Sequence, residues 1–173
     1  NPALGSHVRG MTLTGTAFVA VSTFDQLRTV TRHPIDLQPN ARRSGYDADA
    51  VAEEAEVHEL IQRALSGAKR NNVPKYARYI EEVVDEKRPG VLPPIHLWSP
   101  EPLQVVNHGA DKFIVVPHGS HLLAIDGETQ LTGHYETYRT ASPELRRKHG
   151  AFPLALIIHH GVNVEQAQLY FHD

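Results

Sequence analysis

Residues 121–130 read HLLAIDGETQ, an apolar run that passes through Asp126 and Gly127 into polar residues. This pattern predicts a strand, a tight turn and the first turn of a helix. A helix start carries backbone N–H groups without partners and a partial positive charge, and glycine lets the backbone approach a ligand closely. The stretch therefore predicts an α/β fold with an anion site at the turn. The alternative is a plain connection in which Asp126 caps the helix and Glu128 complements its dipole.

The motif resembles the DGQHR motif of the DndB-like proteins, which are relatives of the ParB/sulfiredoxin fold. Here Glu128, Thr129 and Gln130 stand where the family has Gln-His-Arg. Other blocks resemble the family in the same order, and they lie at 59–83, 91–98 and 152–173. The resemblance covers most of the chain, from about residue 11 to Asp173.

The resemblance implies a fold, a function and a ligand site. The fold is a mixed sheet of the ParB/sulfiredoxin type with flanking helices and an N-terminal helical segment at about 47–87. We expect a single domain over 1–173, as a fragment that lacks its C-terminal continuation. The implied function is that of a DNA-associated protein of a phosphorothioation-type modification or defence system, with a regulatory role in transcription. A nucleotide, ATP or another with Mg²⁺, is expected at the turn of Asp126, Gly127, Glu128, Thr129 and Gln130.

Two further hypotheses remain open for the turn. In the first, the chain is a nucleotide hydrolase or phosphotransferase, such as an ATPase or kinase, in which Asp126 or Glu128 coordinates Mg²⁺ or acts as base. These two carboxylates are therefore the candidate catalytic residues. The second follows from Gln130, which replaces the family's arginine and removes a charge-assisted contact to phosphate. On that hypothesis the domain is non-catalytic, has lost its ligand and serves in assembly.

The composition limits the possible classes of protein. The chain has 173 residues, 40% of them hydrophobic and 21% charged, which suits one globular domain. No apolar run approaches the roughly 18 residues of a membrane span, so we expect a soluble protein. The absence of cysteine excludes disulfides and thiolate chemistry and fits a cytoplasmic location. The net charge of −3 excludes a strongly basic DNA-binding domain, so any contact with DNA must be local.

Short basic pairs supply the candidate DNA contacts, although such pairs are also routine on solvated surfaces. The candidates are Arg42, Arg43, Lys69, Arg70, Lys75 and Arg78, with Arg146, Arg147 and Lys148 as a further group. Tyr76 and Tyr79 lie beside them and could stack on bases, but tyrosines at helical spacing are more often packing residues. A homo-oligomer is a further expectation.

Histidines are the only other candidate ligands. They lie near predicted strand ends, at His118, His121, His134, His159 and His160. Neutral imidazoles bind zinc or nickel, but no His-Glu-x-x-His pattern or comparable signature is present. We therefore predict no metal site.

Periodicity predicts the remaining elements. Strands are expected at 11–22, 91–98, 102–106, 112–116, 121–125 and 153–159. Helices are expected at 24–33, 49–66, 128–140 and 163–172, with another beginning near Pro74 and a loop at 34–49. Because Pro93 and Pro94 cannot donate to a ladder, the strand that contains them is expected at an edge or with a bulge.

Overall fold

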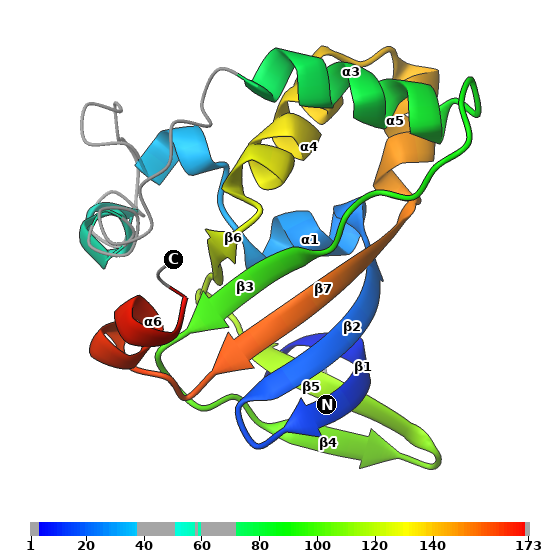
Figure 1. The fold of residues 1–173 in the computed structure, drawn as a ribbon. Helices are drawn as coiled ribbons and strands as arrows, with labels where there is room; N and C mark the ends of the chain where they lie inside the picture. Colours follow the sequence, from blue (N-terminus) through cyan, green and yellow to red (C-terminus); the bar gives the residue numbers. More distant parts are fainter. Residues whose placement is uncertain (1–3, 38–50, 58, 60–71, 172–173) are drawn as a thin grey trace.

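The computed structural model describes residues 4–37, 51–57, 59 and 72–171. Seven strands form one mixed sheet in the order β4-β5-β1-β2-β7-β3-β6 (Figure 1). The strands are β1 (Gly5–Thr14), β2 (Ala17–Thr23), β3 (Ile95–Ser99), β4 (Val105–His108), β5 (Asp111–Pro117), β6 (Leu123–Asp126) and β7 (Pro153–His160). The helices are α1 (Phe24–Val30), α3 (Val73–Val84), α4 (Glu128–Thr140), α5 (Pro143–Gly150) and α6 (Val164–Tyr170), with a 3₁₀ turn η2 (Pro34–Leu37) and a helical stretch at 51–57. The prediction of an α/β fold with a mixed sheet is confirmed.

The strand directions make the sheet mixed. β3 and β7 are parallel, and every other neighbouring pair is antiparallel. The chain leaves β3, forms the hairpin of β4 and β5, then passes through β6, α4 and α5 before it returns as β7. The predicted helical segment lies between β2 and β3, so two strands of the same sheet precede it in the chain.

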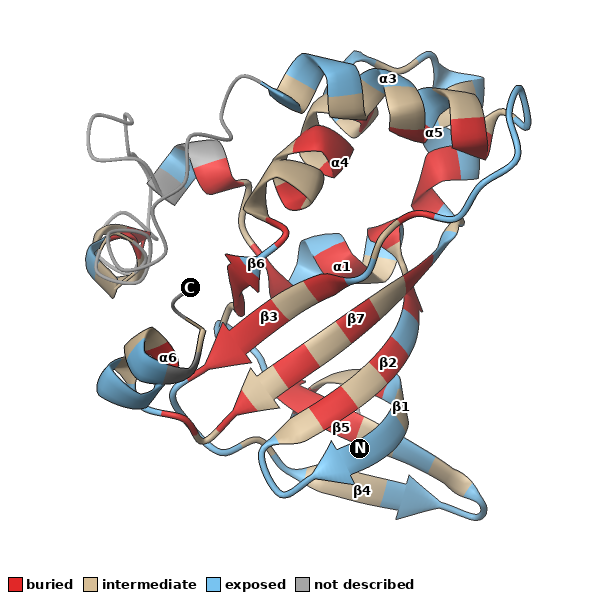
Figure 2. Ribbon diagram, in the orientation of Figure 1, coloured by how far each residue is buried: buried red, intermediate tan, exposed pale blue. Residues whose placement is uncertain are grey.

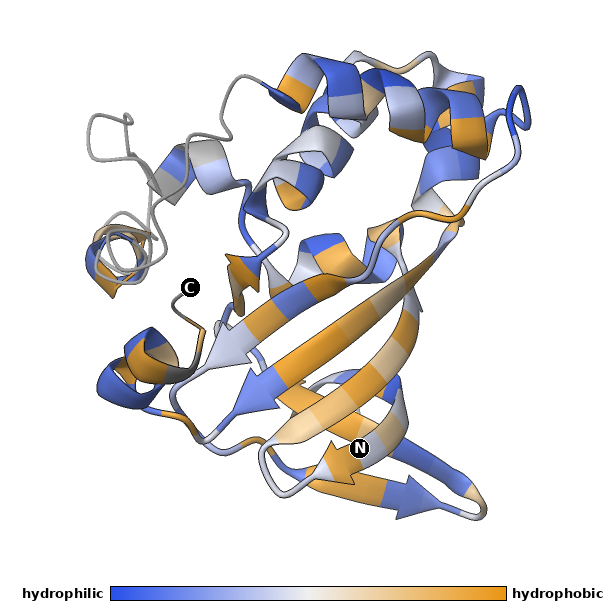
Figure 3. Cartoon of the chain, in the orientation of Figure 1, coloured by the Kyte–Doolittle hydropathy of each residue, from blue (hydrophilic) through white to orange (hydrophobic). Residues whose placement is uncertain are grey.

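The main hydrophobic core lies between one face of the sheet and helices α1, α3 and α4 (Figures 1 and 2). A smaller core lies on the opposite face under α6, around Trp98. Leu97 and Trp98 are consecutive but belong to different cores, because successive strand residues point to opposite faces. The indole N–H of Trp98 donates to the Val162 carbonyl at 2.7 Å, which ties the segment after β7 to β3. Figure 3 shows that β7, near the middle of the sheet, is mostly hydrophobic.

Side-chain caps fix where three helices begin. The Thr23 side chain accepts from the backbone N–H of Gln26 at the start of α1. Ser142 does the same at the start of α5, where Pro143 occupies the first turn. Asn163 forms a reciprocal capping box with Gln166 at the start of α6. Among the described residues, no helix is long and apolar enough to span a membrane.

The structure corrects two predictions about strands. Residues 11–22 are parts of two strands, β1 and β2, which pair in an antiparallel hairpin across a turn at Gly15. The strand after Pro93 and Pro94 is not at an edge, because β3 begins at Ile95, after both prolines, and lies between β7 and β6. The register of β3 against β6 shifts between His96 and Leu97, after the two prolines, so the strand has an irregularity there.

The helix predictions hold with one omission. α1, α3, α4 and α6 lie where they were expected, and the expected helix at 49–66 is helical over 51–57. The expected loop begins with η2, and apart from residue 59, which is helical, the rest of both segments lies outside the described residues. α5 was not predicted, although Ser142 and Pro143 give it a typical helix start.

Candidate functional site

The predicted turn is present at the end of β6. The strand ends at Asp126 and α4 begins at Glu128, with Gly127 between them in the left-handed conformation at φ 90°. A Cβ added to Gly127 would lie 3.4 Å from Gln130 Oε1 and 3.5 Å from Ile95 Cα, which are ordinary contacts. Glycine is therefore required by the backbone conformation rather than by space. The helix start has no side-chain cap, so the interpretation of Asp126 as its cap is wrong.

The turn places the two candidate catalytic carboxylates on either side of Gly127. Asp126 is exposed at the end of the strand, opposite His96 of β3, and Glu128 is half-buried in the first turn of α4. Thr129 and Gln130 are half-buried beside them. In the described part of the chain, no group of three or more His, Asp or Glu side chains could hold a metal ion. A Mg²⁺ at the turn would therefore depend on the nucleotide's phosphates and on water for most of its ligands.

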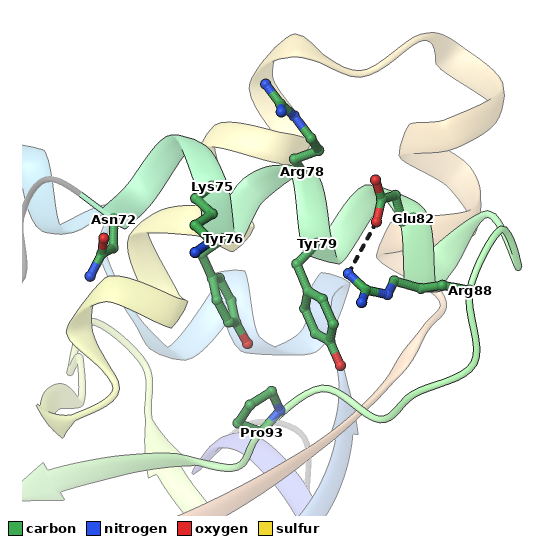
Figure 4. Close-up of a pocket in the computed structure, with 8 residues that line it drawn as sticks. All are labelled: Asn72, Lys75, Tyr76, Arg78, Tyr79, Glu82, Arg88 and Pro93. Carbon is green, nitrogen blue, oxygen red and sulfur yellow. Dashed lines mark hydrogen bonds and ion pairs between the residues drawn. The ribbon is translucent and has the colours of Figure 1, made fainter.

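A hollow of about 640 Å³ lies beside α3, and we call it the α3 hollow (Figure 4). Its lining residues are Asn72, Lys75, Tyr76, Arg78, Tyr79, Glu82, Arg88 and Pro93. Lys75 and Arg78, two of the predicted DNA contacts, are thus brought together with Tyr76 and Tyr79. The volume is in the range of small-molecule sites, which is about 300–1,000 Å³.

The sequence of α3 explains why these side chains share a face. Tyr76, Tyr79 and Glu82 follow one another at steps of three, so they lie along one side of the helix. Ile80, Val83 and Val84 are buried and face the main core. The apolar side of α3 therefore packs against the main core, and the tyrosines and charged side chains lie on the neighbouring side of the helix.

The two tyrosines have different surroundings. Both rings extend from α3 toward Pro93, with centroids 5.9 Å apart and planes tilted by 39° (Figure 4). The hydroxyl of Tyr79 donates to the Val91 carbonyl at 3.3 Å. The hydroxyl of Tyr76 is buried and has no hydrogen-bond partner among the described residues. Burial raises the pKa of Tyr76, so its hydroxyl keeps its proton and remains a donor.

Positive charge predominates around the α3 hollow. Arg88 pairs with Glu82 at 3.2 Å, and its guanidinium carbon lies 5.0 Å from the centroid of the Tyr79 ring. Lys75 and Arg78 are exposed and form no ion pair with another described residue. In Figure 4 the Lys75 side chain lies near the tyrosines, whereas Arg78 extends from the outer side of the helix. The lining therefore has two positive charges in excess, which favours an anionic occupant.

The structure describes only some of the other predicted DNA contacts. Four of them lie outside the described residues, namely Arg42, Arg43, Lys69 and Arg70. The further basic group lies on α5, where Arg146 donates to the carbonyls of Tyr138 and Arg139 and Lys148 pairs with Asp85 at 3.4 Å. Those two cations are engaged in packing α5 against its neighbours.

The α3 hollow and the turn are neighbours in the fold. Pro93 lines the hollow, and Ile95, two residues later and so about 7 Å along the chain, contacts Gly127. On the other side, Tyr76 contacts Gly133 of α4, the helix that the turn begins. Sequence reasoning treated the turn and the basic residues separately, and only the packing of α3 on α4 brings them together.

Histidines form pairs that the sequence did not reveal. His134 of α4 and His149 of α5 are buried, with Nδ1 and Nε2 2.9 Å apart, and both rings stack on Phe24. Burial lowers the pKa of His134 to about 3 and that of His149 to about 4. His96 and His159 form a second stacked pair at 3.0 Å. Each pair joins different elements, so spacing along the chain gave no signal.

The α3 hollow thus combines two tyrosine rings with an excess of positive charge. Comparison with protein-family models, curated proteins and solved structures finds no match for the chain. The resemblance to the DndB-like proteins, and with it the expected DNA, nucleotide and oligomeric partners, therefore stays a prediction.

Proposed function

We propose that the chain is a DNA-associated protein that contacts DNA through the α3 hollow. The observation that carries this proposal is the convergence of Lys75, Arg78 and Arg88 with Tyr76 and Tyr79 around one hollow. Cationic side chains supply most of the affinity of proteins for nucleic-acid phosphates, and aromatic rings stack on bases without regard to sequence. The site offers both kinds of contact within two turns of one helix.

The resemblance to DndB-like proteins supports a role in a DNA modification or defence system, with regulation of transcription as its outcome. The chain's net charge of −3 opposes binding to DNA over the whole surface. Binding must then rely on the few cations of the α3 hollow, so we expect modest affinity and a shallow salt dependence, because the slope scales with the number of phosphate contacts.

The test is fluorescence anisotropy of a labelled DNA oligonucleotide titrated with the protein. The variant Lys75→Gln/Arg78→Gln removes the two cations of the hollow that form no ion pair with a described residue. The matched control, Arg9→Gln/Lys112→Gln, removes one arginine and one lysine from β1 and β5, at the opposite end of the molecule from α3 (Figure 1). The Arg9–Asp111 ion pair lost in the control is exposed and contributes about 0–1 kcal/mol to stability.

We expect the first variant to weaken DNA binding clearly and the control to leave it near the wild-type value. Equal losses in the two variants would mean that only net charge matters, and the α3 hollow would then not be the DNA site. No binding by the wild-type protein at low salt would reject the proposal altogether.

A nucleotide-dependent enzyme is the second candidate, and the geometry of the turn favours it. Left-handed Gly127 opens a helix of 13 residues, whose first backbone N–H groups suit a phosphate, and the exposed carboxylate of Asp126 beside it suits the Mg²⁺ of a nucleotide rather than the phosphate itself. If the turn is catalytic, Glu128→Gln removes nucleotide turnover and retains binding of the nucleotide with Mg²⁺. The matched control is Glu144→Gln, which changes the first-turn glutamate of α5. Absence of turnover by the wild-type protein with any nucleotide and metal would reject this candidate.

A further inference from the structure

We infer that the α3 hollow takes a single unpaired base of DNA, stacked between the tyrosine rings and Pro93, with its backbone phosphates on Lys75 and Arg78. This inference rests on the proposed function and names the ligand class of the same site. With a base in the hollow, the protein should prefer single-stranded to duplex DNA. Contacts with phosphates alone would give no such preference.

The shape of the hollow supports a flat occupant. The rings of Tyr76 and Tyr79 lie side by side on α3 and point toward the pyrrolidine ring of Pro93 on the other wall (Figure 4). Aromatic rings and prolines offer apolar faces on which a base can stack. A base in a duplex is already stacked on both faces, so only an unpaired base can enter.

The charges on the rim fit the backbone that such a base carries. Lys75 and Arg78 are one turn of α3 apart; Lys75 lies beside the hollow, and Arg78, which extends from the outer side of the helix, can meet a phosphate farther along the same strand. Arg88 is held against Glu82 and the ring of Tyr79, so it contributes mainly to the rigidity of the wall. An acidic peptide would satisfy the cations but would leave the aromatic wall unused.

The two tyrosines differ in the hydrogen bonding of their hydroxyl groups, and this difference assigns them different roles. Tyr79 is fixed on both sides, by its hydrogen bond to Val91 and by the guanidinium of Arg88. Tyr76 keeps a buried, protonated hydroxyl that lacks a partner among the described residues. The hydroxyl is buried, so the Tyr76 ring must shift for a base to reach it; a carbonyl or ring nitrogen of the base would then give this unsatisfied donor a partner. Tyr76 is therefore the residue that we expect to contact the base, with Tyr79 as its support.

The experiment compares the affinity for a single strand, for the same strand in a duplex and for the free mononucleotides, by anisotropy and competition. Tyr76→Leu removes the stacking surface, and Tyr76→Phe removes only the unpartnered hydroxyl. The matched control is Tyr135→Phe, which removes a hydroxyl that is hydrogen-bonded to Thr31 and does not line the hollow. Circular dichroism melting of each variant reports whether it folds, and the phenylalanine variants keep the test valid if Tyr76→Leu does not.

We expect the wild-type protein to prefer the single strand, and Tyr76→Leu to weaken that complex roughly fivefold or more while leaving duplex binding unchanged. Tyr76→Phe should weaken single-strand binding severalfold, and Tyr135→Phe should not. A 2-aminopurine placed in the strand should lose fluorescence on binding to the wild-type protein and less on binding to Tyr76→Leu.

Equal affinity for single strand and duplex, with no effect of either Tyr76 variant, would overturn the inference and leave the proposed function standing. The inference would also be overturned if free mononucleotides bound as tightly as the strand and displaced it, because the hollow would then be a mononucleotide site. If the protein binds no DNA at all, the proposed function fails as well.

Discussion

Tyr76 of α3 packs directly on Gly133 of α4. A Cβ added to Gly133 would lie 2.8 Å from Cδ1 of the Tyr76 ring and 3.3 Å from Cδ1 of Ile80, which is closer than side chains allow without movement. The absence of a side chain at position 133 therefore sets how near the two helices approach. It also sets where the Tyr76 ring stands in the wall of the α3 hollow.

Gly133→Ala tests this relationship. Alanine favours a helix by about 1 kcal/mol over glycine, but here its methyl group must displace the Tyr76 ring. We expect DNA binding to weaken severalfold without a gain in melting temperature. The control is Gly150→Ala, whose Cβ would lie 2.6 Å from the carboxylate oxygens of Asp25, an exposed side chain that can swing away. If Gly133→Ala binds DNA as well as Gly150→Ala does, the position of Tyr76 is not important for binding.

Buried His134 and His149 predict how stability depends on pH. Their folded-state pKa values are lowered by burial to about 3 and about 4, whereas in the unfolded chain they titrate near 6.5. The unfolded state thus binds more protons as the pH falls below about 6.5, and stability is lost progressively toward pH 4. The expected slope is at most about 1.4 kcal/mol per pH unit for each histidine, because one unit corresponds to that free energy.

Urea unfolding between pH 7 and pH 5 measures that slope. In His149→Gln one of the two groups no longer titrates, so the slope should be shallower than in the wild-type protein. The control His108→Gln changes an exposed histidine and should keep the wild-type slope. A His149→Gln slope as steep as that of the wild-type protein would show that this pair does not govern the pH dependence.

The left-handed conformation of Gly127 predicts a cost for any other residue. Gly127→Ala should lower the free energy of unfolding by about 1–2 kcal/mol, because an L-residue is strained at φ 90°. The control is Gly15→Ala in the β1–β2 turn, where an added Cβ meets nothing within 4 Å and φ is not in the left-handed region. Denaturant unfolding of both variants measures the difference. Equal stabilities would mean that the turn tolerates other backbone conformations.

Local signals allowed much of the fold to be predicted. Residues 121–130 place a strand, a glycine turn and a helix within ten positions, so the turn at Gly127 could be located before the structure was known. The β1–β2 hairpin was missed because the alternation of residues continues through Thr14–Thr16 with only one glycine. α5 was missed because its apolar pattern is weak, although Ser142 and Pro143 mark its start.

The α3 hollow could be predicted only in part. Lys75 and Arg78 were identified as basic residues, and Tyr76 and Tyr79 were noted beside them, but packing was the favoured interpretation of the tyrosines. Pro93 lies in the opposite wall of the hollow. The chain turns back after α3 to bring it there, and Gly90, at φ 156°, lies in that turn. Proximity of that kind depends on tertiary structure, and no periodicity in the sequence encodes it.

The salt dependence of DNA affinity tests the central claim most directly. Each phosphate contact on a single strand contributes about 0.7 to the slope of log affinity against log salt concentration. If Lys75 and Arg78 both meet phosphates, Lys75→Gln/Arg78→Gln should reduce that slope by about 1.4, and Arg9→Gln/Lys112→Gln should leave it unchanged. An unchanged slope in the first variant would contradict the account, because DNA would then be bound somewhere other than the α3 hollow.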